Sequence, residues 1–257
     1  MELNLNCDLG EKSKHFDGKN DPELLKIINT ANIACGYHAG NKKIIEETIK
    51  ISKKNNVSIG AHPSFKDKKN FGRKRLNLTN NEIYKIVTEQ LKIISKIADK
   101  LKYPITHVKP HGALNNIACE DIDVSMNIAK AIKEFDKNLI FMVLPLTCMD
   151  KAAKKVNIKY ACEIFADRNY NDYGLLIDRS NQNSLINNPK EIIKNIIIML
   201  ENKSIKSITG KLLKTDIDSI CVHGDGYNAV KIAKKIKEGL IKKQINLLPL
   251  NKLSKFM

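Results

Sequence analysis

Histidines and carboxylates recur directly after short apolar runs of this chain, in positions that suit proton transfer. Five of the six histidines follow or end such a run, namely His38, His62, His107, His111 and His223. The acids Asp8, Glu11, Asp167 and Asp225 also come just after apolar runs. Imidazole and carboxylate groups gathered together, with Lys109 and Arg168 added, favour acid–base chemistry or metal-assisted attack on a carbonyl carbon. For any single histidine the alternative is a structural role, but that role explains all five less well.

Metal binding is a separate hypothesis. His107 and His111 have the i, i+4 spacing of a helical zinc motif, but Pro110 lies between them and an apolar run precedes them. A two-histidine, one-carboxylate site is the better candidate, with Asp8, His62 and His111 as its predicted ligands and His107 as the alternative second histidine. Spacing alone does not select which divalent ion such a site would take.

The elements that must position these groups are indicated by alternating patterns. Short β-branched runs are each followed by a stretch in which apolar residues return every three or four positions, as in residues 41–56, 80–101 and 124–137. Thr79 and Glu82 match a helix capping box, and Asp21-Pro22 is a second helix start. The expected strands are Leu3–Cys7, Ala31–Cys35, Val57–Ala61, Ile105–Lys109, Leu139–Leu144, Tyr160–Phe165 and Ile217–Val222.

Alternation of strand and helix predicts an α/β protein with parallel strands covered by helices. Seven strands are well supported, and an eighth at Ile245–Leu248 is cut short by Pro249. No linker divides residues 1–257, so we expect one (β/α) barrel domain, with an open doubly wound sheet as the alternative. In a barrel the carboxyl ends of the strands form one rim, and the five histidines would meet there. No dinucleotide fingerprint or phosphate-binding P-loop motif is present.

Composition excludes several other classes. The net charge is +16, but 40 of the 44 basic residues are lysines scattered along helix faces, and tryptophan is absent. Nucleic-acid readers favour arginine and stacking aromatics, so we expect no nucleic-acid partner. No run of about 18 apolar residues occurs, and the first residues are polar, which favours a cytoplasmic protein without a membrane partner. The six cysteines sit in apolar runs as small core residues, with a catalytic thiol at Cys7 or Cys35 as the alternative.

Eight motifs in order give the chain a resemblance that runs from end to end. They are NCDLGE (6–11), ANIACGYHAG (31–40), IGAHPSF (59–65), NFGR (70–73), HVKPHGAL (107–114), EIFADRNY (163–170), KSITG (206–210) and CVHGDG (221–226). Their order and wording resemble the LamB/YcsF family of 5-oxoprolinase A subunits. The resemblance implies a seven-stranded barrel related to carbohydrate deacetylases. It also implies ATP-dependent opening of the lactam 5-oxo-L-proline to L-glutamate, together with B and C subunits.

Roles follow from this resemblance as hypotheses. Asp8, Glu11, His107, Lys109 and His111 would be catalytic. The substrate would be bound by His38, His62, Arg73, Asp167, Arg168, His223 and Asp225. Glu11 and Asp167 would orient histidines. The chain departs from the family pattern at Asn115, Tyr173, Asp178 and Asn183, which leaves substrate fit open. The alternatives are an ATP-independent, metal-dependent deacetylase or amidohydrolase, and a non-catalytic lactam-binding subunit.

Overall fold

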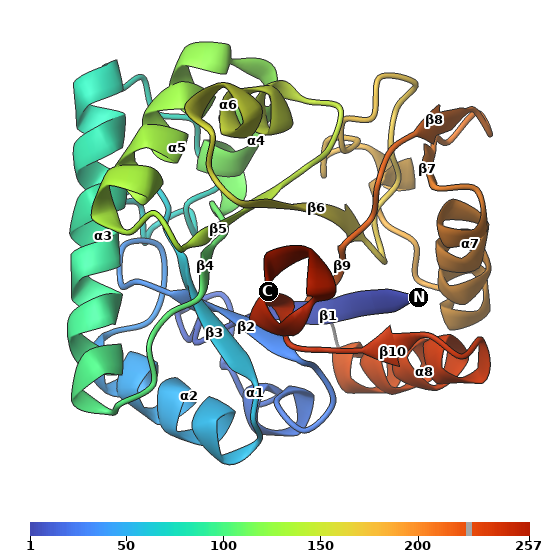
Figure 1. Cartoon of the computed structure of the whole chain (residues 1–257), viewed down its shortest axis with the longest axis horizontal. Helices are drawn as coiled ribbons and strands as arrows, with labels where there is room; N and C mark the ends of the chain where they lie inside the picture. Colours follow the sequence, from blue (N-terminus) through green and yellow to red (C-terminus); the bar gives the residue numbers. More distant parts are fainter. Residues whose placement is uncertain (225–227) are drawn as a thin grey trace.

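Seven parallel strands close into a barrel in the computed structural model, which describes residues 1–224 and 228–257. The strands follow one another around the barrel, and β1 pairs with both β2 and β9 to close it. Figure 1 shows this ring of strands with the helices outside it. The predicted seven-stranded barrel is confirmed. Its strands are β1 (Glu2–Leu9), β2 (Thr30–Ala34), β3 (Ser58–His62), β4 (His107–Val108), β5 (Ile140–Val143), β6 (Tyr160–Phe165) and β9 (Ser219–Val222).

Strand β1 shows how one sequence serves two sides of the barrel. Its alternate residues Leu3, Leu5, Cys7 and Leu9 are fully buried in the main hydrophobic cluster. The residues between them are polar and bond to other strands: Asn4 donates to Thr30, and Asn6 donates to Glu163. Because successive side chains of a strand point to opposite faces, the helix-facing layer is apolar and the barrel centre is polar.

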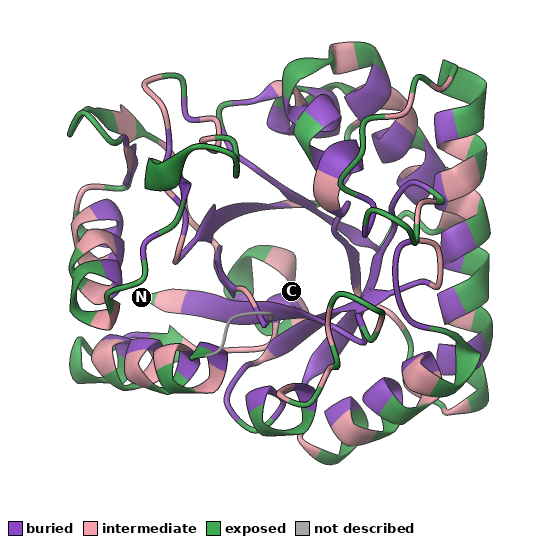
Figure 2. Ribbon diagram, turned by 180° about the vertical axis from the view of Figure 1, so that it is seen from behind, coloured by how far each residue is buried: buried purple, intermediate pink, exposed green. Residues whose placement is uncertain are grey.

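Helices cover the barrel on its outside, and their starts follow the predicted signals. The capping box of Thr79 and Glu82 is present at the start of α3, and Pro22 lies in the first turn of α1. Figure 2 shows that the helices expose one side and bury the other against the strands. The helices are α1 (Asp21–Leu24), α2 (Lys42–Lys54), α3 (Asn80–Lys100), α4 (Gly112–Glu120), α5 (Ile122–Phe135), α6 (Cys148–Val156), α7 (Pro189–Glu201) and α8 (Ala229–Lys242).

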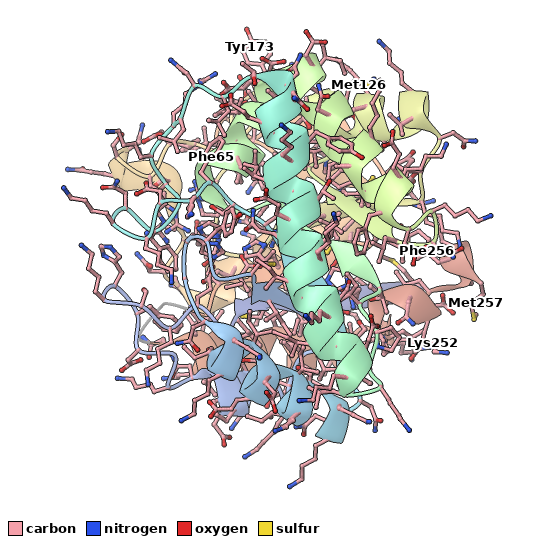
Figure 3. All side chains as sticks on the ribbon, turned by 90° about the vertical axis from the view of Figure 1, so that its left-hand side faces the viewer. Phe65, Met126, Tyr173, Lys252, Phe256 and Met257 are labelled. Atoms are coloured by element: carbon pink, nitrogen blue, oxygen red, sulfur yellow. The ribbon has the colours of Figure 1, made fainter. Side chains whose placement is uncertain are left out.

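The C-terminal segment closes the end of the barrel where the strands begin. The expected eighth strand is β10 (Asn246–Leu247), which pairs with the start of β1 outside the ring. The short helices η2 (Leu250–Lys252) and η3 (Ser254–Phe256) follow, and Leu250 and Leu253 pack on Ile140, Met142 and Ala161. Figure 3 places Phe256 and Met257 on the opposite side of α3 from Phe65, which follows the carboxyl end of β3.

One element was not foreseen from the sequence. Strands β7 (Ser204–Lys206) and β8 (Leu212–Lys214) form an antiparallel hairpin outside the barrel. It lies after the long segment between β6 and α7, which contains one turn of helix, η1 (Gln182–Ser184). Within the described residues, no helix is long and apolar enough to cross a membrane.

Candidate active site

A cavity of about 470 Å³ opens at the carboxyl ends of the barrel strands. Its wall takes Asp8 from β1, His62 from β3, Phe165 from β6 and His223 from the end of β9. Lys109 and His111 enter directly after β4. This is the rim at which barrel enzymes carry their active sites. The strand-end histidines His62, His111 and His223 therefore do meet at one mouth, as the spacing predicts.

Lys109 is the cation at the base of the cavity. Its Nζ lies 3.0 Å from Asp8 Oδ1, 3.1 Å from Glu163 Oε1 and 3.1 Å from Cys221 Sγ, so its three protons each have a partner. Burial alone would lower the pKa of Lys109, but Asp8, Cys221 and Glu163 raise it well above its ordinary value. The lysine is therefore a fixed positive charge held between two carboxylates.

Glu11 lies close to three histidines, of which one follows β2, one ends β3 and one follows β4. Its Oε1 lies 3.1 Å from His38 Nε2, 3.2 Å from His111 Nδ1 and 3.8 Å from His62 Nε2. Asp8 Oδ2 lies 3.4 Å from the same nitrogen of His62. Two carboxylates and three imidazoles thus form one continuous polar centre. The positive φ of Gly40, whose Cβ would stand 2.6 Å from the Gly10 carbonyl oxygen, lets the two loops of this centre approach.

Backbone carbonyls fix the tautomers of two of these histidines. His62 Nδ1 lies 2.6 Å from the carbonyl oxygen of Lys109, and His111 Nε2 lies 2.9 Å from that of Phe71. A carbonyl oxygen only accepts, so each of these ring nitrogens carries its proton. The remaining nitrogens, His62 Nε2 and His111 Nδ1, face each other at 3.0 Å beside Glu11. A proton on one of them, or a cation near both, is needed to satisfy this arrangement.

The charges of this centre are set by burial and by mutual contact. Burial would raise the pKa of Asp8, but His62 and Lys109 hold it well below its ordinary value. The pKa of Glu11 is likewise lowered by His111 and His38 against the effect of burial. His62 shows the opposite: burial would lower its pKa, yet Asp8 and Glu11 raise it. The pair of Asp8 and His62 therefore favours a carboxylate beside an imidazolium.

His107 does not line the cavity, so it cannot contact the substrate directly as its predicted catalytic role requires. Its ring is fully buried one layer below Lys109, where its Nε2 lies 2.8 Å from Asn32 Oδ1 and its Nδ1 lies 2.9 Å from Thr106 Oγ1. Asn32 in turn donates to Asp8 Oδ1 at 2.8 Å. Burial, then Lys109 and His62, lower the pKa of His107 to about 3, so it is neutral. His107 thus supports Asp8 through Asn32 and contacts no cavity space.

His38 also lies behind the cavity wall and is separated from any substrate there. Its ring stacks on His111 with centroids 3.9 Å apart, and its Nδ1 is buried without a hydrogen-bond partner among the described residues. Burial, followed by His111, lowers the pKa of His38 to about 3. His38 therefore orients Glu11 and His111, which differs from the substrate contact predicted for it.

The remaining predicted residues divide between the cavity and its support. His223 lines the cavity, and Asp167 holds its Nδ1 at 2.7 Å from outside the lining. Arg73 and Arg168 line the mouth. Asp225 lies outside the described residues. Of the departures from the family pattern, Asn115 and Asp178 line the cavity, whereas Tyr173 is 81% exposed and the Asn183 carbonyl accepts from Asn169.

Three buried polar residues that contact this centre were not predicted from the sequence. Glu163 contacts Lys109, while Asn6 and Asn32 link Glu163 to Asp8 across the barrel. A signal existed, because each of these polar side chains stands inside an apolar strand run, where only an inward position can satisfy it. Burial raises the pKa of Glu163, and Lys109 counters it in part.

Comparison with known proteins places the whole chain among close relatives. The LamB/YcsF family profile matches residues 3–255. A Staphylococcus epidermidis protein, named as the A subunit of 5-oxoprolinase, is 41% identical over 247 residues, covering 96% of this chain and 98% of the relative. A Campylobacter jejuni subsp. doylei protein of the same name is 40% identical over 250 residues, covering 97% and 98%.

Solved structures agree with this placement. A lactam utilization protein from Thermus thermophilus superimposes with a TM-score of 0.89 at 33% identity, covering 96% of this chain and 99% of its own. The catalytic domain of a peptidoglycan N-acetylglucosamine deacetylase from Eubacterium rectale gives a TM-score of 0.51 at 11% identity, over 98% and 89%. That second likeness shows a shared barrel fold.

Proposed function

We propose, since this chain belongs to the LamB/YcsF family, that it is the A subunit of an ATP-dependent 5-oxoprolinase. It would open 5-oxo-L-proline to L-glutamate in the cytoplasm, with ATP and with B and C subunits. The observation that carries the proposal is the buried centre of Asp8, Glu11, His62, Lys109 and His111 at the base of the cavity. The names of relatives that match nearly the whole chain support it.

The chemistry of this centre fits hydrolysis of a cyclic amide. Opening the lactam forms a C–O bond from water and breaks the C–N bond, so one proton must leave the water and one must reach the ring nitrogen. The Asp8 carboxylate would accept the first proton. The imidazolium of His62, 3.4 Å away, would donate the second. Transfer of a phosphoryl group from ATP to the amide oxygen, with release of ADP, would make the carbon more electrophilic before water attacks. Cleavage of the C–N bond would then leave an acyl phosphate, which a second water would hydrolyse to L-glutamate and inorganic phosphate.

The other residues of the centre would bind and orient. Lys109, a fixed cation beside Asp8, would oppose the negative charge that develops on the substrate. Glu11 would keep His62 and His111 in place, since it contacts both. His223, held by Asp167, would contact the substrate from the far wall of the cavity.

A divalent metal ion is a second proposal for the same atoms. His62 Nε2 and His111 Nδ1 present lone pairs when neutral, and their other nitrogens donate to carbonyls, as the nitrogens of metal-bound histidines commonly do. Asp8 and Glu11 would complete the donor set. His38 fits less well, because its ring is parallel to that of His111 and lone pairs in parallel planes do not converge. A bound ion would polarise a carbonyl and lower the pKa of water.

This donor set also supports a different function, an ATP-independent metal-dependent amidohydrolase or deacetylase. A non-catalytic lactam-binding subunit is the remaining alternative. Metal content separates the first alternative: purified wild-type protein would hold about one ion per chain by elemental analysis, and His111→Ala would lose it. Protein that binds no added Zn²⁺ or Mn²⁺, judged by calorimetry, would remove the metal proposal.

Glutamate release tests the main proposal. The wild-type chain is incubated with 5-oxo-L-proline, with and without ATP, alone and with the B and C proteins. We expect glutamate only in the complete mixture. Asp8→Asn would abolish it, while the exposed matched variant Asp17→Asn would retain it. Undiminished turnover by folded Asp8→Asn would defeat the role of Asp8. No glutamate beside partners that are active with another A subunit would defeat the function itself.

A further inference from the structure

The four arginines of this chain all line one cavity. The other 40 of the 44 basic residues are lysines, yet the described part of the cavity wall contains Arg73, Arg75, Arg168 and Arg179 with Lys109 as its single lysine. Arginine and lysine side chains carry the same charge. They differ in that guanidinium offers a planar fork, which pairs with two oxygens of one anion, whereas ammonium acts as a point charge.

The arginines come from two segments of the chain, one after β3 and one after β6, that line the same cavity. Arg73 and Arg75 follow β3, and Arg73 lies over the Phe71 ring at 4.9 Å. Arg179 lies in the segment after β6 and is exposed. Carboxylates are present too: Glu120 Oε2 lies 3.7 Å from Arg75 Nη1, and Asp178 accepts from the backbone and hydroxyl of Ser180.

Arg168 positions the loop that carries Arg179. It is buried, and its guanidinium donates to the carbonyl oxygens of Ile177 and Ser184 on either side of Arg179. Burial, followed by the charge of Arg179, lowers the pKa of Arg168. The carboxylates of Asp167 and Asp178 offset only part of this effect. Because the charge of Arg179 still lowers the pKa of Arg168, an additional anion near both guanidinium groups would be stabilised.

We propose that Arg73, Arg75 and Arg179 form a phosphoryl-binding site at the mouth of the cavity, with Arg168 as its positioning residue. A carboxylate can pair with one guanidinium group, but three guanidinium groups lining one cavity offer more donors than its two oxygens can use. A phosphoryl group has three free oxygens and up to two charges, and it matches this number of donors. The site rests on the proposed function only for what carries the phosphoryl group, either ATP itself or a phosphorylated lactam.

Calorimetric binding of inorganic pyrophosphate, inorganic phosphate and ATP tests the site without any lactam chemistry. We expect the wild-type chain to bind pyrophosphate. We expect Arg73→Lys, Arg75→Lys and Arg179→Lys each to weaken that binding by roughly tenfold, because the charge is kept while the fork is lost. Lys74→Gln is the matched control: Lys74 stands between two of these arginines, is exposed and does not line the cavity. Removing its charge should leave binding within about twofold.

The outcomes separate the possible ligands. If ATP binds more tightly than pyrophosphate, the ligand of the site is a nucleotide. If ATP binds equally or more weakly, a small phosphorylated compound is favoured as the ligand. Arginine-to-lysine variants that bind like the wild type, or a Lys74→Gln loss as large as theirs, would overturn the proposal in favour of generic electrostatics. Arginine variants that lose binding only of 5-oxo-L-proline, or only of the partner proteins, while they keep pyrophosphate binding, would also overturn the proposal. If the wild-type chain binds pyrophosphate, the arginine-to-lysine variants weaken that binding, and yet no glutamate is released, the proposed function is rejected. The phosphoryl-binding site is then still supported.

Discussion

At the scale of single residues, the site depends on charges that are buried and mutually compensated. Lys109 satisfies two carboxylates, and His107 and Asn32 hold one of them from below. Such groups are costly to bury alone, so each depends on its partner remaining in place. The loss of stability caused by substituting one of these charged residues should therefore be partly restored by substituting its partner.

Lys109→Met should destabilise the protein by about 3–5 kcal/mol, because Asp8 and Glu163 would be left facing each other without a cation. Glu163→Gln in that background should restore part of the loss, since it removes one of the two charges. Urea unfolding of the four proteins of this double-mutant cycle measures the coupling. Lys92→Met, an exposed change on α3, should cost less than about 0.5 kcal/mol. Additive losses for Lys109 and Glu163 would contradict the compensation.

The neutral His107 predicts a pH dependence of stability. Its pKa is about 3 when folded and ordinary when unfolded, so near pH 5 the unfolded chain binds a proton that the folded chain does not. The free energy of unfolding should therefore fall as the pH drops from about 6.5 toward 3, by up to about 1.4 kcal/mol per pH unit from this group. His107→Gln should flatten the slope, as followed by urea unfolding between pH 7 and 5. Equal slopes for both proteins would exclude this origin.

At the scale of elements, the close approach of β3 and β4 is made by Gly60. A Cβ at this position would stand 2.3 Å from Cδ2 and Nε2 of His107, with no room for the ring. Strand β4 can therefore place a histidine inside the barrel because its neighbour has no side chain.

Gly60→Ala should cost about 1–3 kcal/mol and disturb the contact of His107 with Asn32, because the ring must move. Differential scanning calorimetry measures the loss. Gly239→Ala is the matched control: its Cβ would lie 3.2 Å from Ile193 Cγ2, but alanine gains up to about 1 kcal/mol inside helix α8. If the two variants unfold at the same temperature, the packing argument for Gly60 is wrong.

Sequence patterns predicted the elements better than the depth of each side chain. The barrel strands contain β-branched runs long enough to recognise, whereas the three-residue strands β7 and β8 are too short for a periodic signal. The histidines were expected at strand ends, but His107 lies within β4, two residues before Lys109. Two residues of strand correspond to about 6.6 Å, which is enough to move a side chain from the cavity to the layer beneath it.

At the scale of the whole molecule, the polar barrel centre is closed at one end and open at the other. The C-terminal segment supplies the closure: Leu250 and Leu253 are buried against β5 and β6, and the Leu250 amide donates to Thr30 Oγ1 at 3.0 Å. The segment therefore contributes to the stability of the barrel although it lies far along the chain from the strands it covers.

Leu250→Ala should lower the free energy of unfolding by about 2–5 kcal/mol, because a fully buried side chain would leave a cavity at the barrel floor. Thermal unfolding measures the loss, and the 84% exposed Met257→Ala is the control that should change little. Folded Leu250→Ala should still bind pyrophosphate as the wild type does, since the mouth lies at the other end. A small change in stability would mean that the segment is not needed for closure.

The closed floor also has a kinetic consequence. Among the described residues, the cavity at the strand ends opens on the side away from Leu250 and Leu253, so reactant and product share one doorway. The departing molecule must clear that doorway before the next can enter. The product should therefore inhibit by competing with the incoming reactant for this one opening. A molecule or segment bound over the opening would limit the rate of turnover by slowing product release as much as substrate entry.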